Sequence, residues 1–251
     1  MDKVKIIILA LVTLIGISSS AHAEVVLLQH DDFVGFTFWF VSMACLATTV
    51  FLFLERGSVL PKWTASVTVA GIITGVAFIH SMYVRNIWVA TGDSPIIYRY
   101  VDWLITMPLL TIQFYLVLSA VKKVSPTLFL KFLIAPLAMV LGAYAGEAGY
   151  ISPFLGLVIW MVGWIYILYE IFPGEAGRLC AKSTNDDLVT AFGKMRMIVT
   201  IGWTIYPLGY VFGYLTGGID SNTLNVIYNF ADFINKIAFG LIIWSAARNQ
   251  Y

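Results

Sequence analysis

Seven long apolar stretches separated by short polar breaks restrict this 251-residue chain to one kind of fold. A helix needs about 20 mostly apolar residues to cross the hydrocarbon core of a bilayer. Only 12% of the residues are charged and the mean hydropathy is +0.86, whereas a soluble domain carries roughly 25% charged residues. The sequence therefore predicts an all-α membrane protein, a bundle of seven transmembrane helices, over Phe33–Leu54, Trp63–Val84, Ile96–Val121, Leu128–Ala145, Pro153–Ile171, Leu188–Thr216 and Leu224–Ala247.

The breaks between these stretches carry turn residues such as Gly, Pro, Ser and Asp, and none has the length of a linker. We therefore predict one seven-helix domain over residues 24–251. The formal net charge of +1 provides no basic surface for nucleic acid. Cys45 lies in an apolar stretch and Cys180 in a polar segment, so the cysteines predict neither a disulfide framework nor a metal site.

Residues 1–23 have the pattern of a secretory signal peptide. Lys3 and Lys5 give a basic start, Ile6–Ile17 an apolar core, and Ala21-His22-Ala23 a small-residue cleavage pattern. An uncleaved anchor is the alternative, but the apolar core is short for a span of about 20 residues. Cleavage would leave the new N-terminus outside the membrane.

The distribution of basic residues gives an independent prediction of orientation. With the N-terminus outside, only Arg85 and Arg99 fall on the outward side. Cytoplasmic loops of membrane proteins carry an excess of Lys and Arg, so we predict an outside N-terminus and a cytoplasmic C-terminus. The inward side receives Arg56, Lys62, Lys122, Lys123, Lys131, Arg178, Lys182, Lys194, Arg196 and Arg248.

A lysine interrupts the last apolar stretch. Lys236 lies more than a turn from either end of it, where a cation costs at least ~2.5–3.5 kcal/mol and marks a functional site with a partner to be found. Asp232 is the candidate partner, because residues four apart share a helix face. A structural ion pair that locks helix packing is the alternative reading of these two residues.

Most acids lie at the ends of the stretches or in breaks; Glu170 and Glu175 are examples, and Glu147 lies beside a glycine turn where water can solvate it. Asp102 is different, because it sits well inside the third stretch. One buried cation facing Asp102 and Asp232 leaves a net negative pocket, which needs a further positive group or a bound proton. Arg99, one turn from Asp102, is the candidate positive group.

These residues resemble the signature segments of microbial rhodopsins, and within that superfamily the proteorhodopsins. The resemblance covers the chain from about Phe33 to Trp244. It is carried by the segment from Arg99 to Leu110 (RYVDWLITMPLL), the segment from Asp232 to Lys236 (DFINK), His80, the segment from Gly202 to Pro207 (GWTIYP), and the segment from Gly146 to Gly149 (GEAG).

The resemblance implies a role for each matching residue. Lys236 would hold all-trans retinal as a Schiff base. Asp102 would be the primary counterion and proton acceptor, Asp232 the second counterion, and Arg99 the gate on the outer side. Glu147 joins this proton-handling set by the same match. The retinal slot would be lined by Trp103, Thr106, Met107, Leu110, Trp164, Trp203, Tyr206 and Pro207, although aromatic residues are common in any membrane bundle.

Two further positions have roles that the resemblance implies. His80 would bond the acceptor carboxylate and make pumping depend on external pH, whereas a lone histidine in an apolar stretch is more often a packed residue. Leu110 occupies the colour-tuning position, where leucine resembles the green-absorbing group.

Gln113 departs from the usual pattern. It lies eleven residues beyond Asp102, about three turns or roughly 16 Å further inward on the same face. Proton-pumping proteorhodopsins usually carry a glutamate here as the internal proton donor, and an amide cannot give up a proton at physiological pH. We therefore expect reprotonation from the cytoplasm through water and a slow photocycle.

The predicted function is a light-driven outward proton pump in a bacterial inner membrane, surrounded by lipid, and not an enzyme. A sensory photoreceptor that signals through a partner is the alternative, since a slow photocycle suits it, but no signalling domain or long tail follows the seventh stretch.

A sodium pump matches at Gln113 but not at Asp102 and Thr106. A chloride pump is disfavoured because Asp102 already supplies the anion, and a covalently bound chromophore would exclude a ligand-gated receptor. The resemblance also implies a pentamer or hexamer, with Trp39 and His80 either at the subunit contact or facing lipid.

Overall fold

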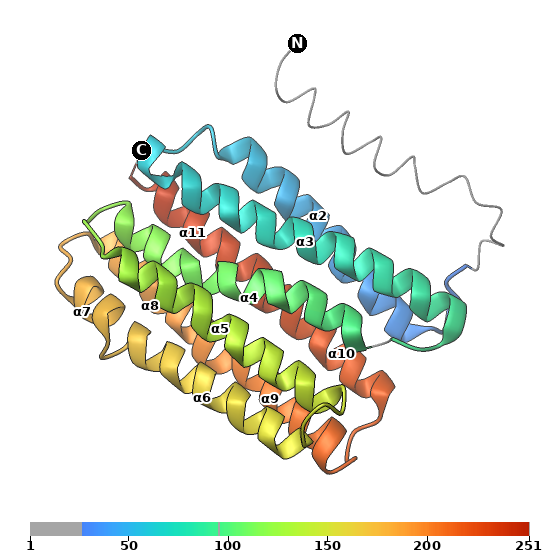
Figure 1. Ribbon diagram of the computed structural model, residues 1–251. Helices are drawn as coiled ribbons and strands as arrows, with labels where there is room; N and C mark the ends of the chain where they lie inside the picture. Colours follow the sequence, from blue (N-terminus) through green and yellow to red (C-terminus); the bar gives the residue numbers. More distant parts are fainter. Residues whose placement is uncertain (1–26, 95, 251) are drawn as a thin grey trace.

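The computed structural model describes residues 27–94 and 96–250, and the predicted signal peptide lies outside these described residues. Seven helical rods run side by side, as Figure 1 shows, and each is long and apolar enough to cross a membrane. The prediction of a seven-helix membrane bundle is therefore confirmed. The elements are α2 (Phe33–Glu55), α3 (Pro61–Thr91), α4 (Ile96–Ser119), α5 (Pro126–Glu147), α6 (Pro153–Ile171), α7 (Glu175–Ala181), α8 (Asp186–Ile201), α9 (Ile205–Tyr210), α10 (Ser221–Asp232) and α11 (Phe239–Arg248).

Local sequence explains where the rods begin. Pro61, Pro126 and Pro153 stand in the first turn of α3, α5 and α6, where a missing backbone N–H costs nothing. Asn185 precedes α8, and its side-chain oxygen accepts a hydrogen bond from the backbone N–H of Leu188, which is the usual N-cap arrangement. These starts fall within a few residues of the predicted ones. The end of α3 differs more from the prediction: the helix was predicted to end at Val84 and continues to Thr91.

The sixth and seventh rods are not continuous α-helices, which is a correction to the predicted uninterrupted spans. A 3₁₀ turn, η1 (Gly202–Thr204), separates α8 from α9, and a π-helical turn, η2 (Val211–Leu215), follows α9. Pro207 has no N–H to donate to the carbonyl four residues earlier, which loosens the helix at this point. A second π-helical turn, η3 (Phe233–Ala238), joins α10 to α11 and contains Lys236.

The segment after α6 also corrects the prediction. Residues 175–181 form the short helix α7, and Cys180 is buried in it rather than exposed in a polar loop. Glu170, expected to be solvated, is buried and accepts a hydrogen bond from Lys131 Nζ at 2.8 Å. Its other carboxylate oxygen accepts from the backbone N–H of Glu175 at 3.2 Å. The carboxylate of Glu170 therefore ties α5, α6 and the start of α7 together.

The rods differ in how much of their surface other rods cover. In an apolar 18-residue segment of α4, 67% of the residues are buried inside the bundle. The corresponding share is 33% in α5 and in the rod that begins at Pro153. Side chains on the outer faces of the bundle are large and apolar, Ile134 and Val162 among them, as expected of surfaces in contact with lipid acyl chains. The chain is a multi-pass membrane protein with α4 at its centre.

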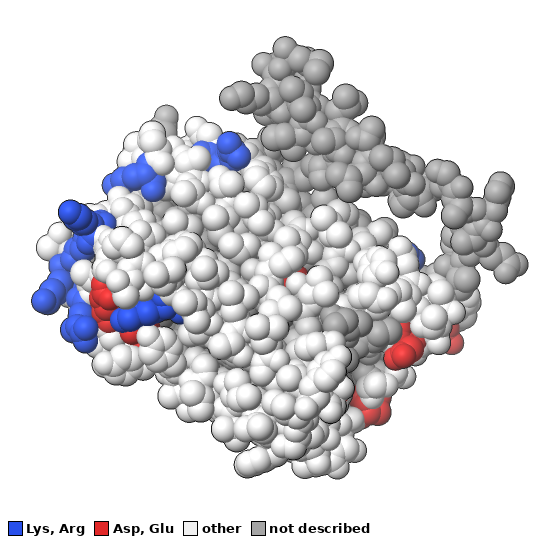
Figure 2. All heavy atoms as spheres, in the orientation of Figure 1, with Lys and Arg blue, Asp and Glu red and all other residues white. Residues whose placement is uncertain are grey.

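The two ends of the bundle differ in charge. We call the end at which α2, α4, α6 and α10 begin the α10 end, and the opposite end, at which α7 lies and α11 finishes, the α7 end. Figure 2 shows most of the visible Lys and Arg side chains gathered at the left, which is the α7 end in Figure 1, with some acidic side chains among them and others at the right.

Candidate functional site

A buried ion cluster lies at the centre of the bundle. The π-helical turn η3 carries Lys236, whose side chain is 1% exposed. Its Nζ donates hydrogen bonds to Asp102 Oδ2 on α4 and to Asp232 Oδ2, the latter at 3.3 Å. Both carboxylates are buried as well. The fold therefore brings together one primary amine and two carboxylates from two different rods, in a region closed to water.

The two carboxylates have different surroundings. Asp232 Oδ1 accepts a hydrogen bond from the Tyr206 hydroxyl at 2.7 Å. Asp102 Oδ1 is buried and has no hydrogen-bond partner among the described residues. Thr106 lies one turn further along α4, and its hydroxyl donates to the backbone carbonyl of Asp102 at 3.0 Å. Asp102 therefore has an unused acceptor oxygen beside the amine, whereas Asp232 is held by a tyrosine.

Arg99 is buried one turn toward the α10 end. Its guanidinium donates to Asn225 Oδ1 at 2.5 Å and to Asn229 Oδ1 at 3.4 Å. It also lies over the rings of Phe38 and Tyr228, at 5.5 and 5.3 Å from their centroids. The side chain is thus held by amide oxygens and aromatic faces. A cavity of about 50 Å³, lined in part by Arg99, Asn225 and Tyr228, lies on its α10-end side.

Aromatic rings stand around the ion cluster. The Trp103 ring lies 5.2 Å from that of Tyr206, 6.0 Å from that of Trp160 and 5.7 Å from that of Tyr228, measured between centroids. The sequence did not single out Trp160 or Tyr228. Each lies one helical turn before a residue that was predicted, Trp164 or Asp232, and this spacing is the signal that could have found them.

The other predicted lining residues are also buried. Trp164 donates through Nε1 to the carbonyl of Val199 at 2.9 Å, while the indole N–H groups of Trp103 and Trp203 have no partner among the described residues. Thr106 and Leu110 lie one turn apart on one face of α4, with Met107 next to Thr106. The set of buried lining residues comprises Trp103, Thr106, Met107, Leu110, Trp164, Trp203, Tyr206 and Pro207.

His80 and Glu147 are two further predicted site residues, and the surroundings of Glu147 differ from those predicted. His80 is half-buried on α3, and among the described residues no hydrogen bond joins it to Asp102. Glu147 was expected to be solvated. Its Oε2 is buried without a hydrogen-bond partner in the described part of the chain, and the carboxylate lies against Tyr100 and Tyr214. Glu147 therefore belongs to the polar interior at the α10 end.

Gln113 lies in the opposite half of the interior. Its Nε2 donates to the carbonyl of Ser66 on α3 at 2.9 Å, while its Oε1 and the Ser66 hydroxyl are buried without partners among the described residues. The neighbouring Phe114 ring is packed against three other phenylalanine rings at centroid distances of 6.0, 4.9 and 5.9 Å, those of Phe132, Phe192 and Phe239. Gln113 therefore bonds to a backbone carbonyl on α3, and no hydrogen bond or ion pair joins it to a titratable side chain among the described residues.

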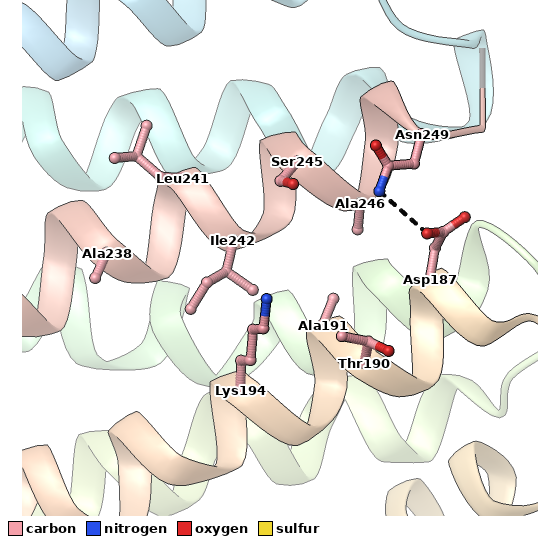
Figure 3. A pocket seen from close by; sticks show the side chains of 10 residues that line it. All are labelled: Asp187, Thr190, Ala191, Lys194, Ala238, Leu241, Ile242, Ser245, Ala246 and Asn249. Carbon is pink, nitrogen blue, oxygen red and sulfur yellow. Dashed lines mark hydrogen bonds between the residues drawn. The ribbon is translucent and has the colours of Figure 1, made fainter.

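Figure 3 shows a cavity at the α7 end, between α8 and α11. It has a volume of about 350 Å³ and reaches from Asp187 and Asn249, which are joined by a 3.1 Å hydrogen bond, to Ala238. The Lys194 side chain points into it. None of the predicted site residues lines this cavity, but Ala238 is two positions from Lys236 along the chain.

The central cluster fits a long apolar ligand with a carbonyl group. A buried primary amine can form a covalent bond to a carbonyl carbon, and its cationic product would be matched by two carboxylates. The rings of Trp103, Trp160 and Tyr206 supply rigid apolar walls, and Asp102 Oδ1 is an unpaired acceptor at the reactive end. Among the described residues no group of His, Cys, Asp and Glu side chains could hold a metal ion.

Comparisons with known proteins agree with this geometry. Residues 32–250 match the family model described as "Bacteriorhodopsin-like protein". The chain is 47% identical over 222 residues to a blue-light absorbing proteorhodopsin of the gamma-proteobacterium Hot 75m4, with 88% of each chain covered. It is also 47% identical over 221 residues to a green-light absorbing proteorhodopsin of the gamma-proteobacterium EBAC31A08, again with 88% of each covered.

The fold is similar to that of a solved relative. The crystal structure of a blue light-absorbing proteorhodopsin from Med12 superposes with a TM-score of 0.76 at 45% sequence identity, covering 88% of this chain and 100% of that one.

Proposed function

Because this chain belongs to the bacteriorhodopsin-like protein family, whose microbial rhodopsins and proteorhodopsins bind retinal as chromophore, we propose that it is a light-driven pump that moves protons out of the cell. The observation that carries the proposal is the Lys236 amine, buried between Asp102 and Asp232 and surrounded by aromatic rings. A structural ion pair would not require an unpaired acceptor oxygen and a cluster of buried aromatic rings beside it.

Retinal, held on Lys236 as a Schiff base, would supply the light absorption and the change of shape that alters the proton affinity of the nitrogen. The residues of the chain handle the proton. Asp102 accepts it, because its Oδ2 already contacts Nζ and its Oδ1 is free to take a proton. Asp232 remains an anion because the Tyr206 hydroxyl donates to it. The aromatic side chains, Trp164 included, and the ring of Pro207 exclude water and orient the ligand.

The α10 end is the outer side in this proposal. The basic side chains gathered at the α7 end support it, because cytoplasmic ends carry the excess of Lys and Arg. So does the signal peptide predicted at residues 1–23, which fits a bacterial inner membrane. A proton leaving Asp102 would then pass Arg99, the small cavity beside it and the Glu147 carboxylate.

Gln113 makes the return of the proton slow. Its amide has no proton to give, so the inner half relies on water that enters from the α7 end, where the cavity beside Lys194 reaches Ala238, two positions from Lys236 along the chain. The same residue favours the second candidate, a sensory photoreceptor with a long-lived signalling state. A sodium pump is a weaker alternative, since Asp102 and Thr106 differ from its pattern.

Colour and assembly are further parts of the proposal. Leu110, buried beside the slot, supports green absorption, because an apolar side chain does little to stabilise the compact charge of the resting chromophore. The equal identities to blue-absorbing and green-absorbing relatives give no preference. Trp39 is exposed, with Arg85 4.9 Å from its ring, and His80 is half-buried on the neighbouring rod, so these residues are the proposed pentamer or hexamer contact.

The test is the light-induced pH change of cells that express the protein with added retinal. We expect acidification of the medium that a protonophore abolishes and that azide, a diffusible proton donor, increases. A coloured protein that gives no acidification with or without azide would overturn the pump and favour the photoreceptor. Replacement of the sodium inside and outside the cells with potassium distinguishes the sodium pump, whose light-driven ion export would stop while light-driven proton export would continue.

A further inference from the structure

Asn235, the residue before Lys236, makes contacts that the predicted site does not include. It lies in the π-helical turn η3 and is 1% exposed. Its Nδ2 donates one hydrogen bond to the carbonyl of Gly202 and another to the Tyr206 hydroxyl oxygen, both at 3.2 Å. One amide thus connects the lysine turn to both sides of the break in the sixth rod.

The bond to Tyr206 has a consequence for the direction of the tyrosine proton. A hydroxyl has one proton to donate and oxygen lone pairs with which to accept. Because Asn235 donates to this oxygen, the proton of Tyr206 is left to point at Asp232 Oδ1, 2.7 Å away. In the hydrogen-bond series from Asn235 through Tyr206 to Asp232, each group therefore donates to the next. The last acceptor is the carboxylate beside Lys236.

The contact between Asn235 and Gly202 explains why residue 202 is a glycine. A Cβ atom placed on Gly202 would lie 1.9 Å from Asn235 Oδ1, well inside contact distance. The amide side chain occupies the space that any other residue would need at the start of the 3₁₀ turn η1. Gly202 and Asn235 thus pack as a pair, and the 3₁₀ turn that begins at Gly202 carries Trp203.

We propose that Asn235 is a positioning residue, which orients the Tyr206 hydroxyl toward Asp232 and couples the turn that bears Lys236 to the break in the sixth rod. It acts through Tyr206 and does not contact the reacting nitrogen. The inference rests on the proposed retinal function for its effect on the photocycle. Its mechanical part, the pairing with Gly202, does not depend on retinal.

The first test is a double-mutant cycle of Asn235→Leu and Tyr206→Phe, read by the absorption maximum and by the rate of light-driven proton transfer to Asp102. Asn235→Leu keeps the size and removes both donors. We expect a shifted maximum and a transfer slowed by up to about 10-fold, which is the upper end of the effect of one hydrogen bond between neutral groups. In the Tyr206→Phe background the same substitution should have no further effect on either quantity, because coupled residues are not additive.

Rescue and control variants separate orientation from packing. Asn235→Ser, which restores a donor but not the volume, should recover most of the spectral shift. Asn249→Leu, at the α7 end, should change neither the spectrum nor the transfer rate. Equal effects of Asn235→Leu with and without the Tyr206 hydroxyl would overturn the proposal, as would an unshifted spectrum.

The second test needs no chromophore. Gly202→Ala alone should lower the melting temperature of the detergent-solubilised protein, and Asn235→Ala in the same chain should restore a large part of that loss, since it removes the clashing amide. Additive losses would overturn the coupling between the two turns. A wild-type protein that binds no retinal would count against the proposed function, and this second test would still decide the pairing.

Discussion

The two halves of the interior, on either side of Lys236, are built from different side chains. The half toward the α10 end is polar, with Arg99, Asn225, Asn229 and Glu147 within it. The half toward the α7 end is packed with phenylalanine around Phe114, and its buried polar groups include Gln113, Thr111, Ser66 and Thr74, none of which titrates in the physiological range.

This difference indicates which direction of proton movement the fold supports without rearrangement. A proton that leaves the centre toward the α10 end meets hydroxyls, amides and carboxylates within the protein. Toward the α7 end, the side chains around Gln113 are phenylalanine rings and neutral polar groups, and the buried Glu170 carboxylate is already bonded to Lys131. For the proposed pump, we expect this asymmetry to set the direction of proton movement and to slow the return step. Each of the four substitutions below changes a residue in one of the two halves or at the centre, where Lys236 lies.

The largest effect is expected at the centre. Lys236→Ala removes the amine that would hold retinal, so we expect complete loss of visible absorption after retinal is added. Lys194→Ala, which removes a lysine from the cavity at the α7 end, is the matched control and should form the pigment normally. Absorption spectra of the purified variants give the answer. Pigment retained by Lys236→Ala would exclude the proposed covalent site.

The next largest effect concerns the polar half. Asp102→Asn removes the acceptor next to Nζ, and we expect the initial rate of light-driven acidification to fall by about 100-fold or more, as general-base losses do. The measurement is the pH of a cell suspension under brief illumination. Asp31→Asn, at an exposed position just before α2 at the α10 end, serves as control and should pump at the normal rate. Equal rates for Asp102→Asn and the wild type would assign the acceptor role elsewhere.

A titratable group placed in the half toward the α7 end should make the two halves of the interior more alike in their ability to carry a proton. Gln113→Glu supplies an internal donor, so we expect the last step of the photocycle to become about 10-fold faster or more and to lose its dependence on azide. Flash photolysis with and without azide measures both. Gln250→Glu, at the α7 end, introduces the same charge change outside the core. If Gln113→Glu leaves the rate unchanged, water entry and not the donor limits recovery.

The smallest effect on function is expected from loosening the apolar half. Phe114→Ala should cost ~3–5 kcal/mol of stability, because it leaves a cavity among three packed rings, and it should speed the azide-independent return of the proton only a few-fold. Phe154→Ala, which removes a ring that is 67% exposed on the outer face, should have little effect on either property. Thermal unfolding in detergent and flash photolysis distinguish the two. Slower recovery in Phe114→Ala would show that the ring does not block water.

The sequence predicted the parts of the fold that depend on a bilayer and the parts of the site that depend on charge. Seven apolar stretches give seven spans, because no other backbone arrangement satisfies seven such segments in lipid. Lys236 and Asp102 stood out because a charge inside an apolar stretch needs a reason. The short helix α7 could not be predicted, since it depends on the buried Glu170 carboxylate, which accepts from the N–H of Glu175 and comes from the preceding rod.

The residues that were missed are neutral. Asn225, Asn229 and Asn235 carry no charge and interrupt no pattern, so their roles are visible only once the rods are packed. Glu147 was assigned to water because a glycine turn follows it, although Tyr100 and Tyr214 cover its carboxylate. Trp160 was one of many aromatic residues until α4 and α6 brought it against Trp103.

The π-helical turn Phe233–Ala238 has one more residue per turn than the helices that it joins. In a continuous α-helix, one inserted residue would rotate everything after it by about 100°, whereas a π-helical turn takes up the extra residue locally. The two parts of the last rod can thus be matched separately to their neighbours, Asn229 to Arg99 at one end and Trp244 to Glu55 at the other. During the evolution of such a helix, an insertion or deletion in this segment can be accommodated while α10 and α11 each keep their contacts with neighbouring rods.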